Sequence, residues 1–258
     1  MRGARFLLMG CLVMGELCAV FAQAKKPGFF ELKIYRLAGK EQEDKVDAFL
    51  KDSYLPALHK SGINNIGVFK PVESDTTFGK RLYVLIPYST LDQFERTSRL
   101  LGGNTVTGSK EYLDADYTNP PYARIETIVL RAFPGMPGME APNHATPRNE
   151  RIYELRSYEG PTEKYYRSKV KMFNDGDEIG LFKRLGFNAV FYADVIAGGR
   201  MPNLMYMTTF PNLAVHDEKW DAFRKDPQWE KLKAMQEYQH NVSKINIFLL
   251  RPTGYSDY

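Results

Sequence analysis

Cysteine is nearly absent from this sequence. The chain has only Cys11 and Cys18, and both lie within the first two dozen residues, a segment that is predicted below to be removed. A mature chain without cysteine has no disulfide, no thiolate nucleophile and no cysteine-ligated metal. Its stability must therefore come from packing.

Long blocks of one charge are also missing. The formal net charge is +4, and Lys and Arg alternate with Asp and Glu along the chain, so no nucleic-acid-binding surface is predicted. The apolar share of 43% is that of a globular protein.

The signature motifs of several enzyme classes do not occur. The sequence has no H-E-x-x-H, no metal-spaced triplet, no G-x-S-x-G, no Walker loop and no Rossmann glycine fingerprint. We therefore predict no metal and no cofactor. The catalytic residues stay unknown, and the sequence leaves open whether the protein is an enzyme.

The first 24 residues have the three-part pattern of a signal peptide. A basic start precedes an apolar run from Phe6 to Phe21, and Ala22-Gln23-Ala24 provides the small residues that a signal peptidase requires. The run is short for a membrane span. We predict cleavage after Ala22 or Ala24, a periplasmic or secreted mature protein, and no stable membrane insertion after cleavage.

The remainder of the chain carries one pattern twice. Residues 30–35 (FELKIY) return as residues 153–158 (YELRSY), and residues 82–88 return as residues 204–210. Leu82 and Leu204 are 122 residues apart, and the other pairs keep a similar offset. Several landmarks in one order at one offset indicate a tandem duplication.

Each copy has the element order β-α-β-β-α-β, which is ferredoxin-like and leaves one face of an antiparallel sheet without helices. We predict an α+β fold of two tandem ferredoxin-like units, residues 27–133 and 150–252, with a proline-rich linker at 134–149. The bare faces are predicted to pack sheet to sheet as a pseudo-dimeric α+β barrel. One helix is predicted over residues 165–184, and another with Asp226 as N-cap.

Side-chain alternation predicts a site between the two sheets. Leu32 and Ile34 are expected to face the helices, which would send their polar neighbours inward. Such charges are costly unless paired, so the row is interpreted either as an ion-pair network or as the lining of a polar ligand pocket. The candidate residues, which include two from the second helix of copy two, are Glu31, Lys33, Tyr35, Glu154, Arg156, Tyr158, His216 and Trp220.

The second copy resembles the NIPSNAP family. Residues 152–158 (IYELRSY) are similar to the family's opening strand, and residues 213–229, ending in Asp226-Pro227-Gln228-Trp229, are similar to its second helix and D-P-x-W ending. The first copy matches more weakly, through residues 30–35, and lacks the D-P-x-W ending, so the resemblance as a whole covers residues 29–252. It implies the α+β barrel fold and a family of poorly defined biochemistry, whose wider relatives include cofactor-free monooxygenases, haem-handling enzymes and stress-response proteins.

The predicted function is the binding of a small hydrophobic or amphipathic molecule in the inter-sheet cavity of an extracytoplasmic protein. One alternative is a cofactor-free monooxygenase or isomerase in which His216, Tyr35 or Tyr158 handles protons. A second alternative is a protein-interaction module. The oligomeric state stays open, with a homo-oligomer among the options.

Overall fold

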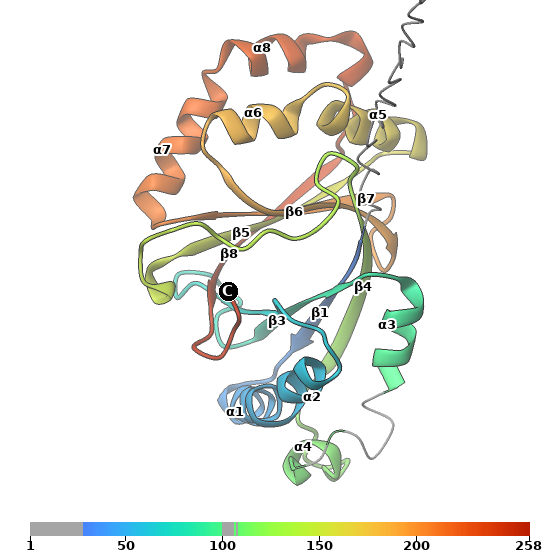
Figure 1. Cartoon of the computed structure of the whole chain (residues 1–258), viewed down its shortest axis with the longest axis vertical. Coiled ribbons are helices and arrows are strands. Elements are labelled where there is room, and N and C mark those ends of the chain that lie inside the picture. The colour runs from blue at the N-terminus through green and yellow to red at the C-terminus, as the bar shows by residue number, and fades with distance from the viewer. Residues whose placement is uncertain (1–27, 100–105, 107) are drawn as a thin grey trace, which may run out of the picture.

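Eight antiparallel strands in the described part of the chain close into a barrel (Figure 1). The computed structural model describes residues 28–99, 106 and 108–258. The order around the barrel is β1-β3-β2-β8-β5-β7-β6-β4. The strands are β1 (Phe29–Arg36), β2 (Gly67–Pro71), β3 (Arg81–Tyr88), β4 (Arg124–Ala132), β5 (Ile152–Glu159), β6 (Asn188–Ala197), β7 (Asn203–Phe210) and β8 (Lys244–Pro252).

The strand order repeats between the two halves of the chain. The first half contributes β4-β1-β3-β2 and the second contributes β8-β5-β7-β6, the order of a ferredoxin-like sheet in each case. The two sheets join where β2 pairs with β8 and where β4 pairs with β6. The predicted α+β fold of two ferredoxin-like units closed into a barrel is confirmed.

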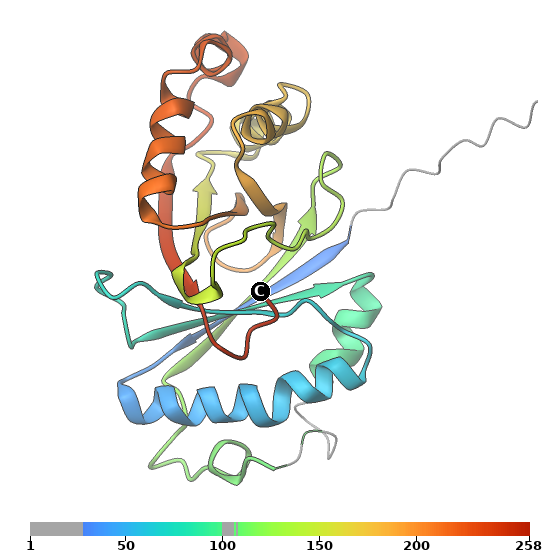
Figure 2. The same cartoon turned by 60° about the vertical axis from the view of Figure 1, so that its left-hand side comes forward.

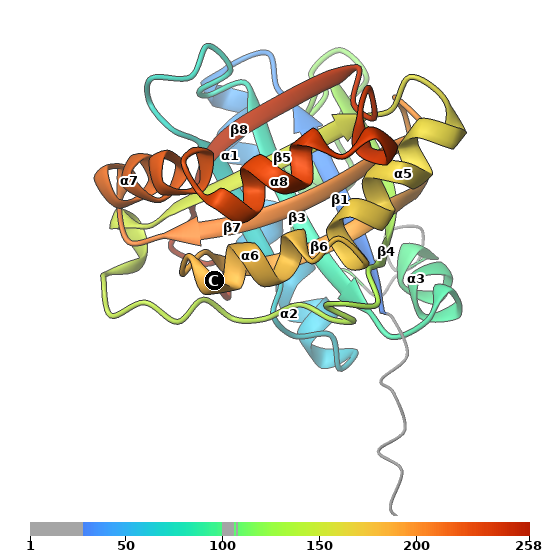
Figure 3. The same cartoon turned by 90° about the horizontal axis from the view of Figure 1, so that it is seen from above.

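Helices cover the outer surface of the barrel in two groups (Figures 2 and 3). Those of the first half lie on one side of the molecule, and α5 to α8 lie over β5 to β8 on the other. The first group is α1 (Lys40–Phe49), the π-helical turn η1 (Leu50–Tyr54), α2 (Leu55–Lys60), α3 (Leu91–Ser98) and α4 (Lys110–Leu113). The second part of the chain holds η3 (Arg148–Glu150), α5 (Glu163–Asn174), α6 (Glu178–Arg184), α7 (Leu213–Arg224), α8 (Pro227–Ala234) and η4 (Gln236–Tyr238).

The helix predicted over residues 165–184 is interrupted, so that prediction is wrong in this detail. The chain leaves α5 at Asn174 and enters α6 through Asp177, which has a φ of 61°. Gly176 allows the break because a Cβ there would lie 2.6 Å from the Met172 carbonyl oxygen. The break turns Glu178 into the protein interior, where it is 2% exposed.

The start of α8 follows the sequence prediction. Asp226 is the N-cap, its side chain accepts a hydrogen bond from the Gln228 backbone N–H at 2.9 Å, and Pro227 is the first helical residue. Asp226 also accepts a bond from Arg184 at 2.8 Å, which ties α8 to α6. The D-P-x-W sequence therefore fixes the position of Trp229 at the first turn of α8.

The barrel interior is filled by apolar side chains from both halves. Leu32 of β1 and Leu155 of β5 lie in one buried cluster with residues from the other strands. Tyr35 belongs instead to the cluster beneath α1 and α2, and Tyr158 belongs to the cluster beneath α5 to α7. Leu32 therefore faces inward, the opposite of the sequence prediction.

The prediction that the polar rows point between the sheets is wrong for a physical reason. A strand of this barrel is buried on both faces, so an apolar side chain does not indicate which face meets the helices. The closed interior offers few polar partners, whereas helix side chains can hydrogen-bond to buried charges. The residues that face the helical layer are Glu31, Lys33, Tyr35, Glu154, Arg156 and Tyr158, and the two helical candidates, His216 and Trp220, lie on α7 outside the barrel.

Some predictions fall outside the described residues. The signal peptide at residues 1–24 and both cysteines are among them. Within the part of the chain that is described, no helix combines the length and apolar character needed to cross a bilayer.

Candidate functional site

Glu154 is the centre of a buried polar network on the helix side of β5. Its Oε1 atom accepts a hydrogen bond from Arg156 Nε at 2.8 Å and lies 2.7 Å from Arg156 Nη2. Its Oε2 atom accepts a bond from Trp220 Nε1 at 2.5 Å and lies 3.4 Å from His216 Nε2. The carboxylate is 1% exposed and both of its oxygens have partners, which allows a charge to be buried there.

Spacing along α7 explains how one carboxylate meets two helix side chains. His216 and Trp220 are four residues apart, so they lie on the same face of the helix. Asn212 caps that helix by accepting a hydrogen bond from the Val215 N–H at 3.0 Å, which fixes where its first turn begins. The sequence thus brings both side chains down onto β5.

Arg156 is held from three directions. Besides its two contacts with Glu154, its guanidinium carbon lies 3.6 Å from the centroid of the Trp220 ring, which is a stacked cation–π contact. Its Nη1 atom donates to the Tyr158 hydroxyl at 3.2 Å, and that hydroxyl is 2.9 Å from the hydroxyl of Tyr206. The guanidinium is therefore fixed in place without a ligand.

His216 lies between two carboxylates. Its Nδ1 atom is 2.7 Å from Asp217, and its Nε2 atom faces Glu154. Burial alone would lower the pKa of His216, but the contacts with Glu154 and Asp217 outweigh burial and raise it. Burial alone would raise the pKa of Glu154, but His216 and Arg156 lower it below its usual range. Both pKa shifts favour an ion pair of His216 with Glu154, and the 3.4 Å between Nε2 and Glu154 Oε2 is a contact rather than a well-formed hydrogen bond.

A second buried pair joins α5 to α6. Lys169 Nζ lies 2.8 Å from Glu178 Oε2, and the two side chains are 5% and 2% exposed. The same ammonium is 4.7 Å from the centroid of the Phe173 ring and 5.6 Å from that of Trp229. Burial raises the pKa of Glu178, an effect that Lys169 offsets only in part.

The two networks border a cavity of about 340 Å³ between the sheet and the helices of the second half, which we name the helix-side cavity. A volume of this size suits a small organic ligand. β5, β8, η4 and all four helices from α5 to α8 contribute to its walls. It is lined by Arg156, Tyr158, Lys169, Met172, Glu178, Phe182, Trp220, Phe223, Arg224, Trp229, Lys233, Tyr238, Gln239, His240, Asn241, Val242 and Ile245.

The polar row of the first half is packed differently. Lys33 Nζ is 3.1 Å from Glu31, whose other oxygen accepts a hydrogen bond from the Tyr88 hydroxyl at 3.0 Å. Tyr35 is fully buried and accepts a bond from Tyr112 at 3.3 Å. Burial raises the pKa of Tyr35 well above its usual value, so this hydroxyl stays protonated. The row is an internal hydrogen-bonded network beneath α1 and α2.

The structure thus divides the eight predicted site residues. Arg156, Tyr158 and Trp220 line the helix-side cavity. Glu154 and His216 do not line it, but Glu154 bonds to Arg156 and Trp220, and His216 lies beside Glu154. The three candidates of the first half form a separate cluster. Sequence reasoning missed Lys169 and Glu178, although a lysine next to the apolar positions of α5 was a usable signal. It also missed Trp229 as a lining residue.

Comparison with known proteins finds a family match in the second half of the chain. Residues 153–257 match the model of the NIPSNAP family. No curated protein matches the chain. All residues that line the helix-side cavity fall within the matched range.

Three solved structures share the whole fold. A proposed monooxygenase from Lactobacillus acidophilus is 12% identical, with a TM-score of 0.55 over 88% of this chain and 94% of the other. A proposed monooxygenase from Fusobacterium nucleatum is 8% identical, with a TM-score of 0.55 over 88% and 93%. An anthrone oxidase-like protein is 10% identical, with a TM-score of 0.54 over 89% and 93%. At these identities the likeness concerns the α+β barrel alone. The chain is therefore an α+β barrel in which residues 153–257 match the model of the NIPSNAP family.

Proposed function

We propose that the protein binds a small amphipathic anion in the helix-side cavity. The observation that carries this proposal is the lining of that cavity. The lining includes four basic side chains, Arg156, Lys169, Arg224 and Lys233, and one acidic side chain, Glu178, while most of the remaining wall is aromatic or aliphatic. Carboxylates outside the lining also pair with Arg156, Arg224 and Lys233. Basic groups beside an apolar wall are complementary to a ligand with an anionic group on an aromatic or aliphatic body.

The two deepest cations are held in place before a ligand arrives. Glu154 and Trp220 fix the guanidinium of Arg156, and Glu178 fixes the ammonium of Lys169. Fixed groups lose little conformational entropy when they bind a ligand, which favours affinity. Arg224 and Lys233 are more exposed, with 63% and 46% of their side chains accessible. They are placed to attract an anion at the rim.

Binding suits this geometry better than proton-transfer catalysis. Both ring nitrogens of His216 face carboxylates, so neither is directed toward a bound molecule. Tyr35 is buried in the other half, where its hydroxyl stays protonated. The monooxygenase or isomerase alternative would need a proton acceptor facing the ligand, and His240, which does line the cavity, is an exposed residue at its rim.

A fluorescence titration with anilinonaphthalene sulfonate tests the proposal, because this probe joins a sulfonate to an aromatic body. We expect saturable binding that Lys233→Glu weakens about tenfold, equivalent to about 1.4 kcal/mol. Lys231→Glu is the matched control, since Lys231 is an exposed residue of the same helix that does not line the cavity. Equal dissociation constants for the two variants, or no saturable binding to the wild type, would show that the cavity is not the site.

We also propose that the mature protein is extracytoplasmic, on the strength of the signal-like pattern in residues 1–24. Cell fractionation with intact-mass measurement tests this. The expected species is exported and begins after Ala22 or Ala24, whereas a full-length chain in the cytoplasm would overturn the idea.

A further inference from the structure

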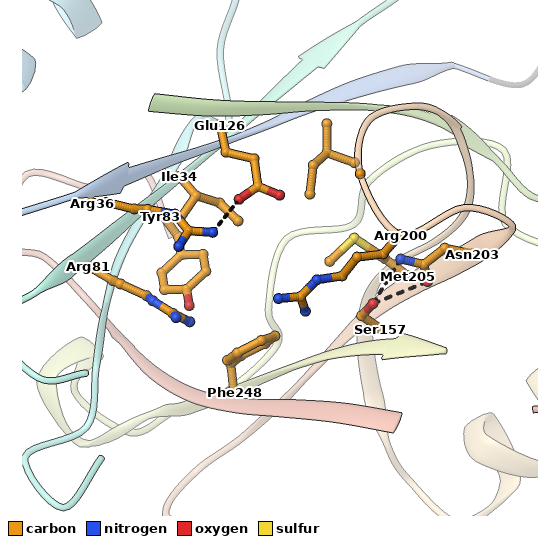
Figure 4. A pocket seen from close by; sticks show the side chains of 12 residues that line it. Ile34, Arg36, Arg81, Tyr83, Glu126, Ser157, Arg200, Asn203, Met205 and Phe248 are labelled. Atoms are coloured by element: carbon orange, nitrogen blue, oxygen red, sulfur yellow. Dashed lines mark hydrogen bonds and ion pairs between the residues drawn. The ribbon is translucent and has the colours of Figure 1, made fainter. Parts of the chain in front are cut away.

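The barrel interior becomes polar at one end. Where β1 ends and β3, β4 and β7 begin, the inner wall carries Arg36, Arg81 and Glu126, and the turn between β6 and β7 adds Arg200 (Figure 4). These side chains border a small opening of about 30 Å³, which we name the barrel mouth. The enclosed part of this space takes one or two atoms of the size of a water oxygen, and it opens to solvent beside Arg36 and Arg200, which are each about half exposed.

Two of the three arginines lack a close counter-charge. Arg36 Nη2 is bound to Glu126 at 3.0 Å. Arg200 reaches only to 3.9 Å from Glu159, and no ion pair forms with Arg81 among the residues that the structure describes. The guanidinium groups of Arg81 and Arg200 point into the same space in Figure 4. Two cations that converge above an apolar wall repel each other unless an anion lies between them.

A buried hydroxyl in the same place lacks a hydrogen-bond partner. Tyr83 lines the barrel mouth, its side chain is fully buried, and its oxygen makes no well-formed hydrogen bond within the described part of the chain. Burial raises the pKa of Tyr83, and the neighbouring Arg81 guanidinium offsets part of that rise. Leaving a buried polar group unpaired costs about 1–3 kcal/mol. A buried hydroxyl of this kind is expected to have a hydrogen-bond partner, and an oxygen of a ligand could provide one.

The backbone that carries Arg200 is strained. Its φ is 63°, a left-handed conformation that costs a residue with a Cβ about 1–2 kcal/mol. The turn before it is closely packed, because a Cβ on Gly198 would lie 3.3 Å from Ile128 Cγ2. Strain of this kind often accompanies a functional position. Here it accompanies a guanidinium directed over the barrel mouth.

We propose that the barrel mouth is a second binding site, which takes one small oxyanion between the Arg81 and Arg200 guanidinium groups and the Tyr83 hydroxyl. The ligand group is a carboxylate or a phosphate, because guanidinium groups and hydroxyls donate to such oxygens. The site lies at one end of the barrel interior, so it is separate from the helix-side cavity, which lies outside the sheet.

Amide chemical shifts measured by NMR test this site with two probes, inorganic phosphate and acetate, at constant ionic strength. We expect the Gly199 amide to shift with saturation for at least one probe, and the probe that works identifies the preferred oxyanion. Tyr83→Phe removes only the unpaired hydroxyl and should weaken that binding about tenfold while leaving the fold intact. Arg200→Gln should weaken it at least as much. Arg99→Gln, at an exposed arginine beside α3, should leave it unchanged.

The proposal fails if neither probe gives saturable shifts at Gly199, or if Tyr83→Phe and Arg200→Gln bind both probes as the wild type does. Arg200 is about half exposed, so its substitution keeps the test valid even if the change at Tyr83 disturbs folding. Because the site is independent of the helix-side cavity, loss of phosphate or acetate binding should leave the dissociation constant of anilinonaphthalene sulfonate unchanged.

Discussion

Arg156 and Trp220 share one carboxylate and also contact each other. The guanidinium carbon lies 3.6 Å from the centroid of the Trp220 ring, while the indole N–H and the guanidinium both donate to Glu154. The strand and α7 are therefore joined by a closed set of three contacts. Each group holds the other two in the orientation that borders the helix-side cavity.

Replacing Trp220 by Phe should destabilise the protein more than its ring volume suggests. The variant retains an aromatic ring but leaves Glu154 Oε2 without its closest donor, a loss of about 1–3 kcal/mol in the free energy of unfolding. Trp229→Phe is the control, because Trp229 has no comparable bond to a buried carboxylate among the described residues. Urea denaturation measures both, and equal losses would refute a special role for the Trp220 N–H.

The charge on His216 should make stability depend on pH. Because the pKa of His216 is raised in the folded state, its contribution is fully present below about pH 6.5, the unfolded value, and is lost as the pH rises through the folded value. The stability difference between the wild type and His216→Gln should therefore shrink above that pH, by about 1.4 kcal/mol per pH unit at most. A difference that is constant or grows with pH would contradict this ion pair.

Lys169 and Glu178 should behave as a unit. Lys169→Met leaves a buried carboxyl group without its partner and should cost about 3–5 kcal/mol, whereas Lys169→Met with Glu178→Leu should cost less than the single change. Lys171, on the same helix as Lys169, pairs with Glu237 of η4 in a more exposed position, so Lys171→Met should have little effect. Thermal or denaturant unfolding measures the free energy of unfolding of the wild type, of each single variant and of the double variant. Additive losses would mean that the two side chains do not act on each other.

The fold could be predicted from the sequence because its signals are redundant. The repeat at an offset of 122 residues, the element order in each copy and the Asp226-Pro227 cap all point to the same architecture. The break between α5 and α6 was missed because Gly176 and Asp177 interrupt an otherwise helical pattern for only a few residues. A short break of this kind depends on tertiary contacts that local propensity does not contain.

The candidate site could be predicted only in part. Glu154, Arg156 and Trp220 were grouped correctly, since alternation along β5 and spacing along α7 place them together. Their side of the sheet was predicted wrongly because both faces of β5 are buried, and hydrophobicity alone cannot distinguish two buried faces. Glu178 was missed because only the break before α6 turns it toward Lys169.

The most direct test of the account uses the intrinsic fluorescence of the protein. The sequence has 2 tryptophans, Trp220 and Trp229, and both line the helix-side cavity. We predict that anilinonaphthalene sulfonate quenches tryptophan emission as it binds. Within each protein, the midpoint of this quenching should equal the midpoint of the rise in probe fluorescence. The prediction applies to the wild type, to Trp220→Phe and to Trp229→Phe. Saturable binding of the probe with tryptophan emission unchanged in all three proteins would contradict a ligand site beneath these helices.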